Sequence, residues 1–425
     1  MVVENESSMS KQQQTPSNTE LVMSRRHFLY GVIGAGVLGA TLGAPEIECA
    51  YAEENVTSLQ VSPDEIISQV DDCEKAEPEN MVSLVGSFEL PFGTLVWANN
   101  DSYAACLFPT ETSKPITKAG ALFLGSGNYS VLLEDAVGAA QGFDIYDVRL
   151  SDQGIIWTEA NIFSNVWHIY TATFDGNGIG EAIKVDEGDS DWETPTIAAI
   201  GSNAYWQVLP HLSGNKLDQV SELRRAAFGR DSKNVVFTSH GRMCSPIYPS
   251  SDRLVITPRT ETDAIHHRLT CLDGATGETK DTLVLPSSMR PLEAGWGKNG
   301  FFFCFDGGYS HGGGIANMGT YTPQDYFGQG DYIKKTWFWW TKSPTAPPCW
   351  CGDFFVVKST TNVCGVDLAT KTYFVIATES GSDTYGDYLA STGMNSNFVT
   401  YANINSKSID GTVRKCCLVR VWQPL

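Results

Sequence analysis

Short runs of β-branched and aromatic residues recur along this chain, and each run follows a polar turn built from Asp, Asn, Ser or Gly. The first apolar residues of seven such runs are Tyr103, Ile155, Tyr205, Leu254, Phe301, Phe354 and Phe398. They are 52, 50, 49, 47, 53 and 44 residues apart. Because one four-stranded blade of a β-propeller takes about 40–50 residues, this spacing predicts seven blades.

Within each repeat, the first run is followed by a second β-like run, such as residues 166–174, and often by a third, such as residues 282–285. Turns such as residues 175–178 have the composition of hairpin connections. Helical periodicity is clear only in Pro63–Ala76, and it is ambiguous in residues 217–228. The pattern therefore predicts an all-β protein.

Proline stands before several of the polar turns, as in residues 194–197 and 245–249. This arrangement resembles TolB-type and WD-repeat-like propellers, in which proline starts a blade and an Asp/Asn/Gly turn leads into an apolar strand. The resemblance covers residues 81–425 and implies a β-propeller, although no Trp-Asp dipeptide ends the strands. Six or eight blades, or a pair of β-sandwiches, are the structural alternatives.

The last repeat is short of a strand. After Phe398 and a second run at residues 415–421, only four residues follow. Met81–Leu90 is a β-like run that precedes the first repeat. We expect it to pair with the C-terminal run, because this pairing would cover two sheet edges at once.

Residues 1–52 have the features of an export signal. A pair of arginines precedes a glycine-rich apolar run, residues 31–42, that is too short for a membrane span, and a small-x-small pattern suited to signal peptidase follows. The residues that carry these features are Arg25, Arg26, Phe28, Leu29, Ala50 and Ala52.

Residues 24–29 resemble the bacterial twin-arginine (Tat) consensus S-R-R-x-F-L. The resemblance implies that the Tat translocase exports the chain, and we expect cleavage after Ala52. Residues 53–80 would then be an N-terminal linker with a short helix, and the mature protein would be periplasmic, secreted or on the cell surface. An uncleaved N-terminal anchor is the alternative.

The chain is strongly acidic, with 49 Asp and Glu against 29 Lys and Arg and a net charge of −20. Such a field repels nucleic acid and anionic membrane surfaces, so we expect no nucleic-acid partner. The sequence suggests a monomer that uses no cofactor.

Ten of the 11 cysteines follow residue 52, and export would allow disulfides whose pairing the sequence does not define. Cys349 and Cys351 are separated by one residue, and Cys416 and Cys417 are adjacent, so neither pair has the spacing of a zinc site. Cysteines within apolar runs, such as Cys106, Cys271 and Cys304, are expected to be small buried hydrophobic residues.

One motif suggests catalysis. Gly308–Gly312 has the pattern G-x-S-x-G, which resembles the nucleophile elbow of α/β-hydrolases. In that fold the histidine base follows the serine and the acid, but no histidine follows His311 here. Three glycines also stand where the helix of an elbow would begin, so a glycine-rich loop is the preferred interpretation.

Three other patterns are assigned to structure rather than to chemistry. Residues 152–157 match the D-x-G-x-x-W core of the Asp-box of sialidase-like propellers, which stabilises a hairpin turn. Residues 175–186 imitate part of a calcium loop but have Ile179 where an oxygen ligand should be, so a hairpin turn is preferred. His266 and His267 point to opposite faces of an expected strand and are not predicted to share a metal.

The segment 306–335 departs most from the repeat. This segment is long and rich in glycine, and its aromatic side chains could stack on a sugar or peptide. These candidate ligand-binding residues are Tyr309, Tyr321, Tyr326, Phe327 and Tyr332. We therefore expect a binding or interaction module for a glycan, peptide or protein, and no catalytic residue is assigned. A hydrolase or lyase with its site at the mouth of the propeller channel is the alternative.

Overall fold

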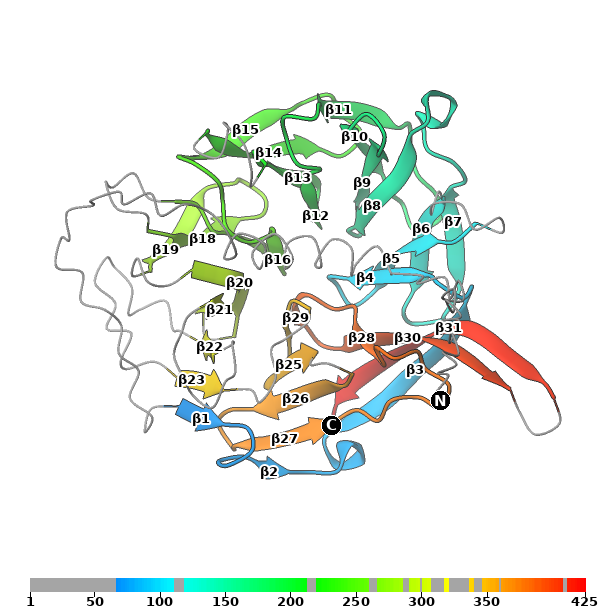
Figure 1. The fold of residues 1–425 in the computed structure, drawn as a ribbon, viewed down its shortest axis with the longest axis vertical. Coiled ribbons are helices and arrows are strands. Elements are labelled where there is room, and N and C mark those ends of the chain that lie inside the picture. The colour runs from blue at the N-terminus through cyan, green and yellow to red at the C-terminus, as the bar shows by residue number, and fades with distance from the viewer. Residues whose placement is uncertain are drawn as a thin grey trace, which may run out of the picture. The chain divides into compact units, whose positions relative to one another are not determined.

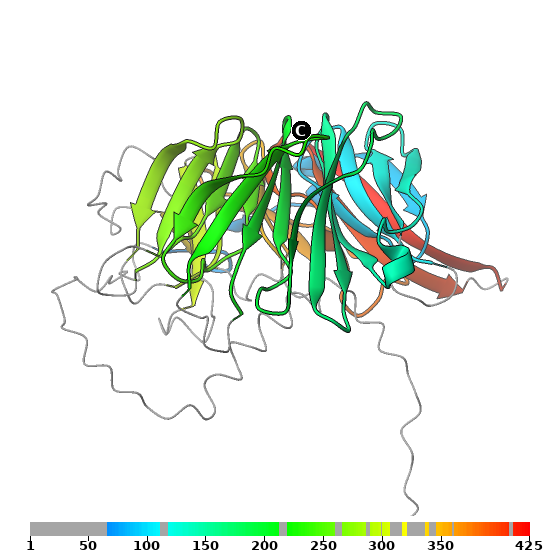
Figure 2. The same ribbon diagram turned by 90° about the horizontal axis from the view of Figure 1, so that it is seen from above.

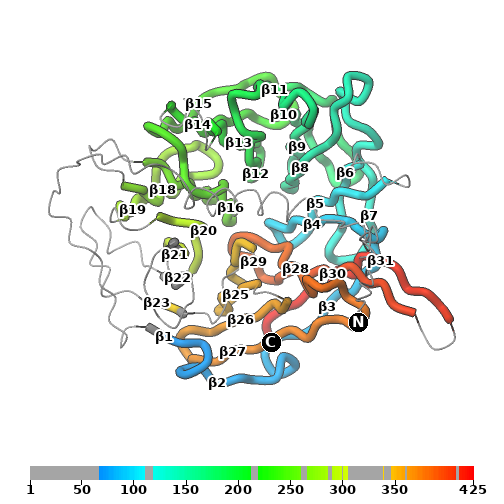
Figure 3. The backbone as a smooth tube through the Cα atoms, in the orientation of Figure 1, coloured from blue at the N-terminus to red at the C-terminus, as the bar shows by residue number. Residues whose placement is uncertain are grey.

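Seven β-sheets surround a common centre in the computed structural model, and from residue 95 to residue 375 the chain passes through successive sheets in order (Figures 1 and 3). The strands run between the two faces of this ring (Figure 2). All described residues lie in the unit Ala50–Leu425. They are residues 66–110, 118–211, 219–259, 266–285, 290–298, 300–306, 317–320, 336–339, 346–358, 361–407 and 411–425.

Four sheets are each formed by four consecutive antiparallel strands. Their strands are β4 (Leu95–Ala98), β5 (Tyr103–Phe108), β6 (Lys118–Phe123) and β7 (Tyr129–Leu133); β8 (Asp144–Leu150), β9 (Gly154–Asn161), β10 (Val166–Thr173) and β11 (Ile183–Gly188); β12 (Thr196–Ile200), β13 (Asn203–Val208), β14 (Ser221–Ala227) and β15 (Asn234–Ser239); and β16 (Tyr248–Ser250), β17 (Arg253–Ile256), β18 (Arg268–Asp273) and β19 (Thr279–Val284).

The other three sheets also recruit strands from the N-terminal segment. In spatial order they are β1 (Ile66–Ser68), β23 (Thr336–Trp339), β22 (Asn317–Thr320), β21 (Gly300–Asp306) and β20 (Arg290–Gly297); β2 (Glu74–Lys75), β27 (Thr372–Val375), β26 (Val363–Asp367), β25 (Phe354–Lys358), β24 (Cys349–Cys351) and β29 (Gly393–Asn395); and β28 (Tyr388–Leu389), β30 (Phe398–Lys407), β31 (Val413–Pro424) and β3 (Val82–Leu90). Two short 3-10 helices, η2 (Pro78–Asn80) and η3 (Ala139–Gln141), complete the described elements.

The ring confirms the prediction of an all-β propeller, and it excludes the alternative of paired sandwiches. Each of the seven apolar residues that mark the repeats lies in the strand next to the first strand of its sheet, in β5, β9, β13, β17, β21, β25 or β30. In six of the seven sheets, the strand before the marked one and the polar turn between them form a hairpin. In the last sheet, β29, which pairs with β24 of the neighbouring sheet, lies between β28 and β30 in the chain. No helix in the described ranges is long and apolar enough to cross a membrane.

The predicted pairing of the N-terminal run with the C-terminal run is confirmed. β3 is antiparallel to β31, in a register that runs from Val82 opposite Pro424 to Leu90 opposite Cys417. Val82 and Leu90 are each only 3% exposed, so this strand contributes to the core as well as to the ladder.

The predicted helix at Pro63–Ala76 is wrong where the structure describes it, because β1 and β2 lie there instead. β1 runs parallel to β23, and β2 runs parallel to β27. The backbone N–H groups of Glu74 and Ala76 donate to carbonyls of the strand-edge residues Lys371 and Tyr373, each at 2.8 Å. Hydrogen bonding to the unpaired backbone groups at the edges of β23 and β27 thus outweighs the short helical periodicity of this segment. The ambiguous segment near residue 220 is likewise a strand, β14.

The ten described cysteines form no disulfide with one another, and all but Cys244 are buried. Burial raises the pKa of the Cys271 thiol to about 12, and it also raises that of Cys106. Cys106, Cys271 and Cys304 are at most 2% exposed, which confirms that they act as small hydrophobic residues.

A buried ion pair joins the last strand, β31, to the residue just before β28. Arg420 Nη2 donates to Asp387 Oδ2 at 2.7 Å, and these side chains are 8% and 0% exposed. Within the described residues, Asp387 Oδ1 and Arg420 Nε have no hydrogen-bond partner. Burial raises the pKa of Asp387, and the nearby charges of Arg420 and Lys358 oppose that rise.

Candidate functional site

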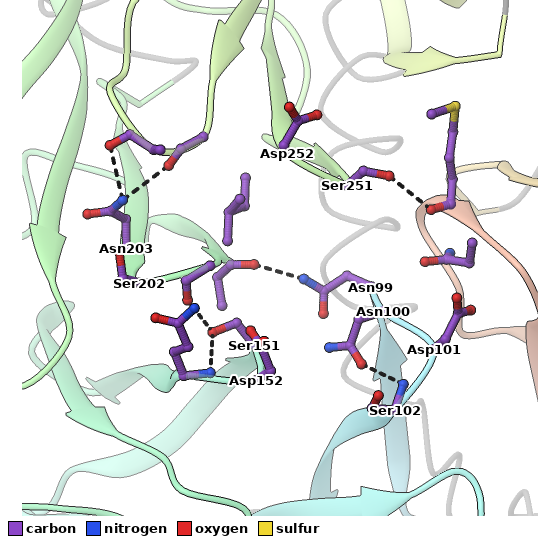
Figure 4. A pocket seen from close by; sticks show the side chains of 18 residues that line it. Asn99, Asn100, Asp101, Ser102, Ser151, Asp152, Ser202, Asn203, Ser251 and Asp252 are labelled. Atoms are coloured by element: carbon purple, nitrogen blue, oxygen red, sulfur yellow. Dashed lines mark hydrogen bonds between the residues drawn. The ribbon is translucent and has the colours of Figure 1, made fainter.

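Polar turns from several sheets meet around a cavity of about 570 Å³ (Figure 4). Four of these turns join the first and second strands of successive sheets, and they are the turns that mark repeats in the sequence. The lining residues are Asn99, Asn100, Asp101, Ser102, Ser151, Asp152, Gln153, Ala199, Ile200, Gly201, Ser202, Asn203, Ser251, Asp252, Gly274, Ala275, Met394 and Asn395.

Hydrogen bonds between neighbouring turns hold the cavity wall together. Asp101, in the β4–β5 turn, accepts from the backbone N–H of Ser396 at 3.0 Å, from its hydroxyl at 2.6 Å and from the N–H of Asn397 at 3.1 Å. These bonds join the first complete repeat to the last one. Asp101 is therefore used mainly in positioning the wall.

Three further bonds extend this arrangement around the cavity (Figure 4). Ser151 Oγ donates to the carbonyl of Gly201 at 2.7 Å, and Asn203 Nδ2 donates to the carbonyl of Gly274 at 3.2 Å. Ser251 Oγ donates to the carbonyl of Met394 at 3.1 Å. Because each bond joins turns of different sheets, the wall is fixed before any ligand arrives.

Asn99 and Asn100 present amide groups in the same wall. Asn99 Nδ2 reaches across to the carbonyl of Ala199 at 2.8 Å. Asn100 Oδ1 accepts from the N–H groups of Ser102 and Tyr103, each at 2.8 Å, which leaves its Nδ2 buried without a partner among the described residues. A buried amide donor without a partner is costly, so Asn100 could bind an acceptor atom of a ligand.

Among the described lining residues, the charged side chains are all acidic. They are Asp101, Asp152 and Asp252, and no described Lys, Arg or His lines the cavity. Asp152 is exposed, and the side chain of Asp252 is 76% exposed, with Arg253 Nε 3.5 Å from its Oδ1. The cavity thus combines negative charge with amide and hydroxyl groups, and within the described ranges no three His, Cys, Asp or Glu side chains are grouped to hold a metal.

The candidate site residues selected from the sequence fall outside the part of the chain that the structure describes. Tyr309, Tyr321, Tyr326, Phe327 and Tyr332, together with the G-x-S-x-G segment, lie outside the described residues, as do the signal residues from Arg25 to Ala52. In the sequence, the polar turns are interpreted only as markers of where each repeat begins. The signal that could have identified the site is the recurrence of Asp, Asn and Ser at the same place in successive repeats.

The Asp-box-like segment forms part of this wall. Its turn joins β8 to β9, and Ser151 Oγ accepts from the N–H groups of Gln153 and Gly154, each at 3.2 Å. A side chain on Gly154 would lie 2.0 Å from the ring of Phe228, so only glycine allows this close approach of two sheets. The structural role predicted for the segment is confirmed.

In the two segments weighed as metal sites, the structure shows a turn at Asp175 and a buried His266. Asp175 Oδ1 accepts from the N–H groups of Asn177 and Gly178, each at 2.9 Å, in the connection between β10 and β11, as the hairpin interpretation predicts. His266 is buried, with its Nδ1 3.1 Å from the carbonyl of Leu285. Burial and the nearby charges of Arg290 and Arg259 lower the pKa of His267 to about 4.

Comparison with known proteins shows similarity only among solved structures. No protein-family model and no curated protein matches the chain. A prolyl endopeptidase is 11% identical with a TM-score of 0.46, over 79% of this chain and 47% of its own. An acylaminoacyl peptidase is 9% identical with a TM-score of 0.45, over 78% and 52%. The β-propeller domain of the Trilobed protease from Pyrococcus furiosus is 8% identical with a TM-score of 0.44, over 80% and 94%.

This chain spans about half the length of the two peptidases. At these identities the likeness concerns the propeller fold alone.

Proposed function

We propose that this propeller is a binding module whose cavity at the strand-joining turns takes a polar ligand with a cationic group. The observation that carries the proposal is a preformed wall that presents the exposed carboxylates Asp152 and Asp252 and, among the described lining residues, no basic side chain. Its volume, about 570 Å³, lies in the range of small-molecule sites. The net charge of −20 would also favour the approach of a cation.

The lining suggests how such a ligand would be held. Asp152 and Asp252 are exposed carboxylates that can accept from an ammonium or guanidinium group. The free Nδ2 of Asn100 would donate to a hydroxyl or carbonyl of the same ligand. Peptides with a basic residue, amino sugars and polyamines combine these features.

Replacing the exposed carboxylates tests this assignment. We expect Asp152→Asn and Asp252→Asn each to weaken the binding of a cationic probe, such as spermidine or an arginine tripeptide, about 5- to 10-fold at low salt, because each removes about 1 kcal/mol of attraction. Calorimetric titration at two salt concentrations would measure the change. Glu181→Gln, an exposed acidic position outside the cavity, is the matched control. Equal binding by all the variants would refute the site.

Hydrolysis in the same cavity is the second candidate. General acid and base catalysis can be carried out by two carboxyl groups, and two exposed carboxylates line this preformed cavity. Incubation with peptide and glycan libraries, followed by mass spectrometry, would separate the two functions. If the protein hydrolyses a library compound and Asp152→Asn abolishes that turnover, the protein is an enzyme. If the compounds bind but are recovered intact, it is a binding module. The aromatic segment 306–335 stays a predicted second contact for the ligand.

We also propose that the protein works outside the cytoplasmic membrane, on the basis of Arg25, Arg26 and the Ala50-x-Ala52 pattern. The double variant Arg25→Lys, Arg26→Lys should accumulate as an unprocessed precursor in the cytoplasm. Cell fractionation and N-terminal sequencing would measure this, with Lys11→Gln as the control. Unchanged processing of the double variant would rule out the Tat route.

A further inference from the structure

Three apolar side chains are exposed at one end of the sheet β8–β11. Phe163 is 94% exposed and Ile162 is 57% exposed in the turn between β9 and β10, and Val137 is 53% exposed in the loop before β8. An isolated exposed valine is ordinary, but an almost fully exposed phenylalanine beside an exposed isoleucine is not. We call these three side chains the apolar platform.

The turn that carries Ile162 and Phe163 is held by its own first residue. Asn161 Oδ1 accepts from the N–H of Phe163 at 3.1 Å and from that of Ser164 at 3.2 Å. Asn165 then adopts a left-handed conformation with φ of 54°, which asparagine tolerates better than most residues. The two exposed side chains are therefore presented by a defined turn.

The loop that carries Val137 is fastened to the same hairpin. The carboxylate of Glu159 is fully buried and accepts from the N–H groups of Val137 at 2.6 Å and Gly138 at 2.8 Å. Asn161 Nδ2 donates to the carbonyl of Gln141 at 3.2 Å. Because these bonds join the two segments, the platform is preorganised, which lowers the entropy cost of binding a partner.

The surroundings of the platform are acidic. The three segments at this end of the sheet, residues 134–144, 159–168 and 186–193, contain nine Asp and Glu but no Lys or Arg. Residues 186–193 lie at the same end of the sheet as the β9–β10 turn. Val166 pairs with Asn161 at that turn, and the next residue, Trp167, pairs with Gly188 at the end of β11. Asp135 and Asp189 are exposed. Several of the other acids, such as Asp186, pair with cations from outside these segments.

We propose that the apolar platform docks into a partner protein that offers an apolar pocket bordered by lysine or arginine. The charge pattern selects this occupant, since an anionic bilayer would be repelled by the same acids that attract a basic rim. β9 begins at the cavity turn and ends at the platform eight residues later, about 25 Å away. Partner and cavity ligand can thus be bound together.

Site-specific photocrosslinking tests the docking surface in the full-length protein. A benzophenone amino acid would replace Phe163 in the cells that naturally make the protein, and the crosslinked peptides would be identified by mass spectrometry. We expect one dominant protein whose crosslinked site is apolar with flanking lysine or arginine. The same probe at Tyr129, a 43% exposed aromatic position on another sheet, should not crosslink that protein. Crosslinks to lipid, to a second copy of this chain or to nothing would each overturn the proposal.

Binding to the identified partner gives the quantitative test. Phe163→Ser should weaken it at least 10-fold, and Asp135→Asn should reduce its dependence on salt concentration. Val413→Ser removes a side chain of similar exposure, 59%, from a different hairpin and should leave binding unchanged. Equal effects of Phe163→Ser and Val413→Ser would contradict a specific platform.

Discussion

Deletion of residues 53–92 is expected to lower the melting temperature by at least about 5 °C or to prevent folding. The deletion removes β3, which pairs with β31 along its length and buries Val82 and Leu90. Loss of two buried aliphatic side chains costs about 2–5 kcal/mol each, and a domain of this size loses about 1–2 °C per kcal/mol. Thermal unfolding followed by circular dichroism would measure the effect.

A shorter deletion is the matched control. Removal of residues 53–76 takes away β1 and β2, which lie at the edges of two sheets, together with the buried Cys73, and leaves β3 in place. We expect a clearly smaller loss of stability from this variant. If the two truncated proteins had the same melting temperature, or if both had that of the parent, the pairing of β3 with β31 would not be what stabilises the ring.

The largest effect of a single substitution is expected at the buried pair Asp387–Arg420. Arg420→Met leaves a carboxylate without its closest cation, and Asp387→Leu leaves a guanidinium without its anion, so each should lower the free energy of unfolding by about 3–5 kcal/mol. The double variant should lose much less than the sum, because no charge of the pair remains unpaired. Urea unfolding of all four proteins would give the coupling energy.

The exposed pair Lys118–Glu134 is the control for this cycle. Its atoms are 2.6 Å apart, but the side chains are 40% and 68% exposed, so its removal should cost no more than about 1 kcal/mol. Additive losses at Asp387 and Arg420 would mean that the two side chains do not stabilise the fold as a pair.

The pH dependence of the same cycle has a defined sign. Burial raises the pKa of Asp387 above its ordinary value of 3.8, so the folded state holds this proton more tightly than the unfolded state does. Asp387 therefore favours folding at low pH and loses that contribution as the pH rises through its folded pKa. Compared with the wild type, the double variant should gain relative stability as the pH is raised above 3.8.

The sequence predicted the ring because its repeat is local. Each polar turn is followed by an apolar strand within a few residues, and all seven marked residues lie in equivalent strands. The closure by Met81–Leu90 could also be predicted, since a strand was missing at one end of the chain and unassigned at the other. Both predictions depend on pattern and count, which a single sequence contains.

The N-terminal segment and the cavity could not be predicted in the same way. Ile66–Ser68 is a strand only because an edge of β23 is available, and β23 lies more than 260 residues later in the chain. Asp101, Asp152 and Asp252 look like ordinary turn residues until closure of the ring brings them together. The topology of the ring places these three carboxylates near one another. Their presence in the turns is explained by turn propensity alone.

The pairing of β3 with β31 imposes an order on biosynthesis. β3 is made early, but its partner Val413–Pro424 leaves the ribosome after every other described strand. Throughout that interval β3 has no neighbour on the side that β31 later covers, and its apolar residues must stay out of wrong pairings. The pairing of β3 that closes the ring can therefore form only after β31 has been made.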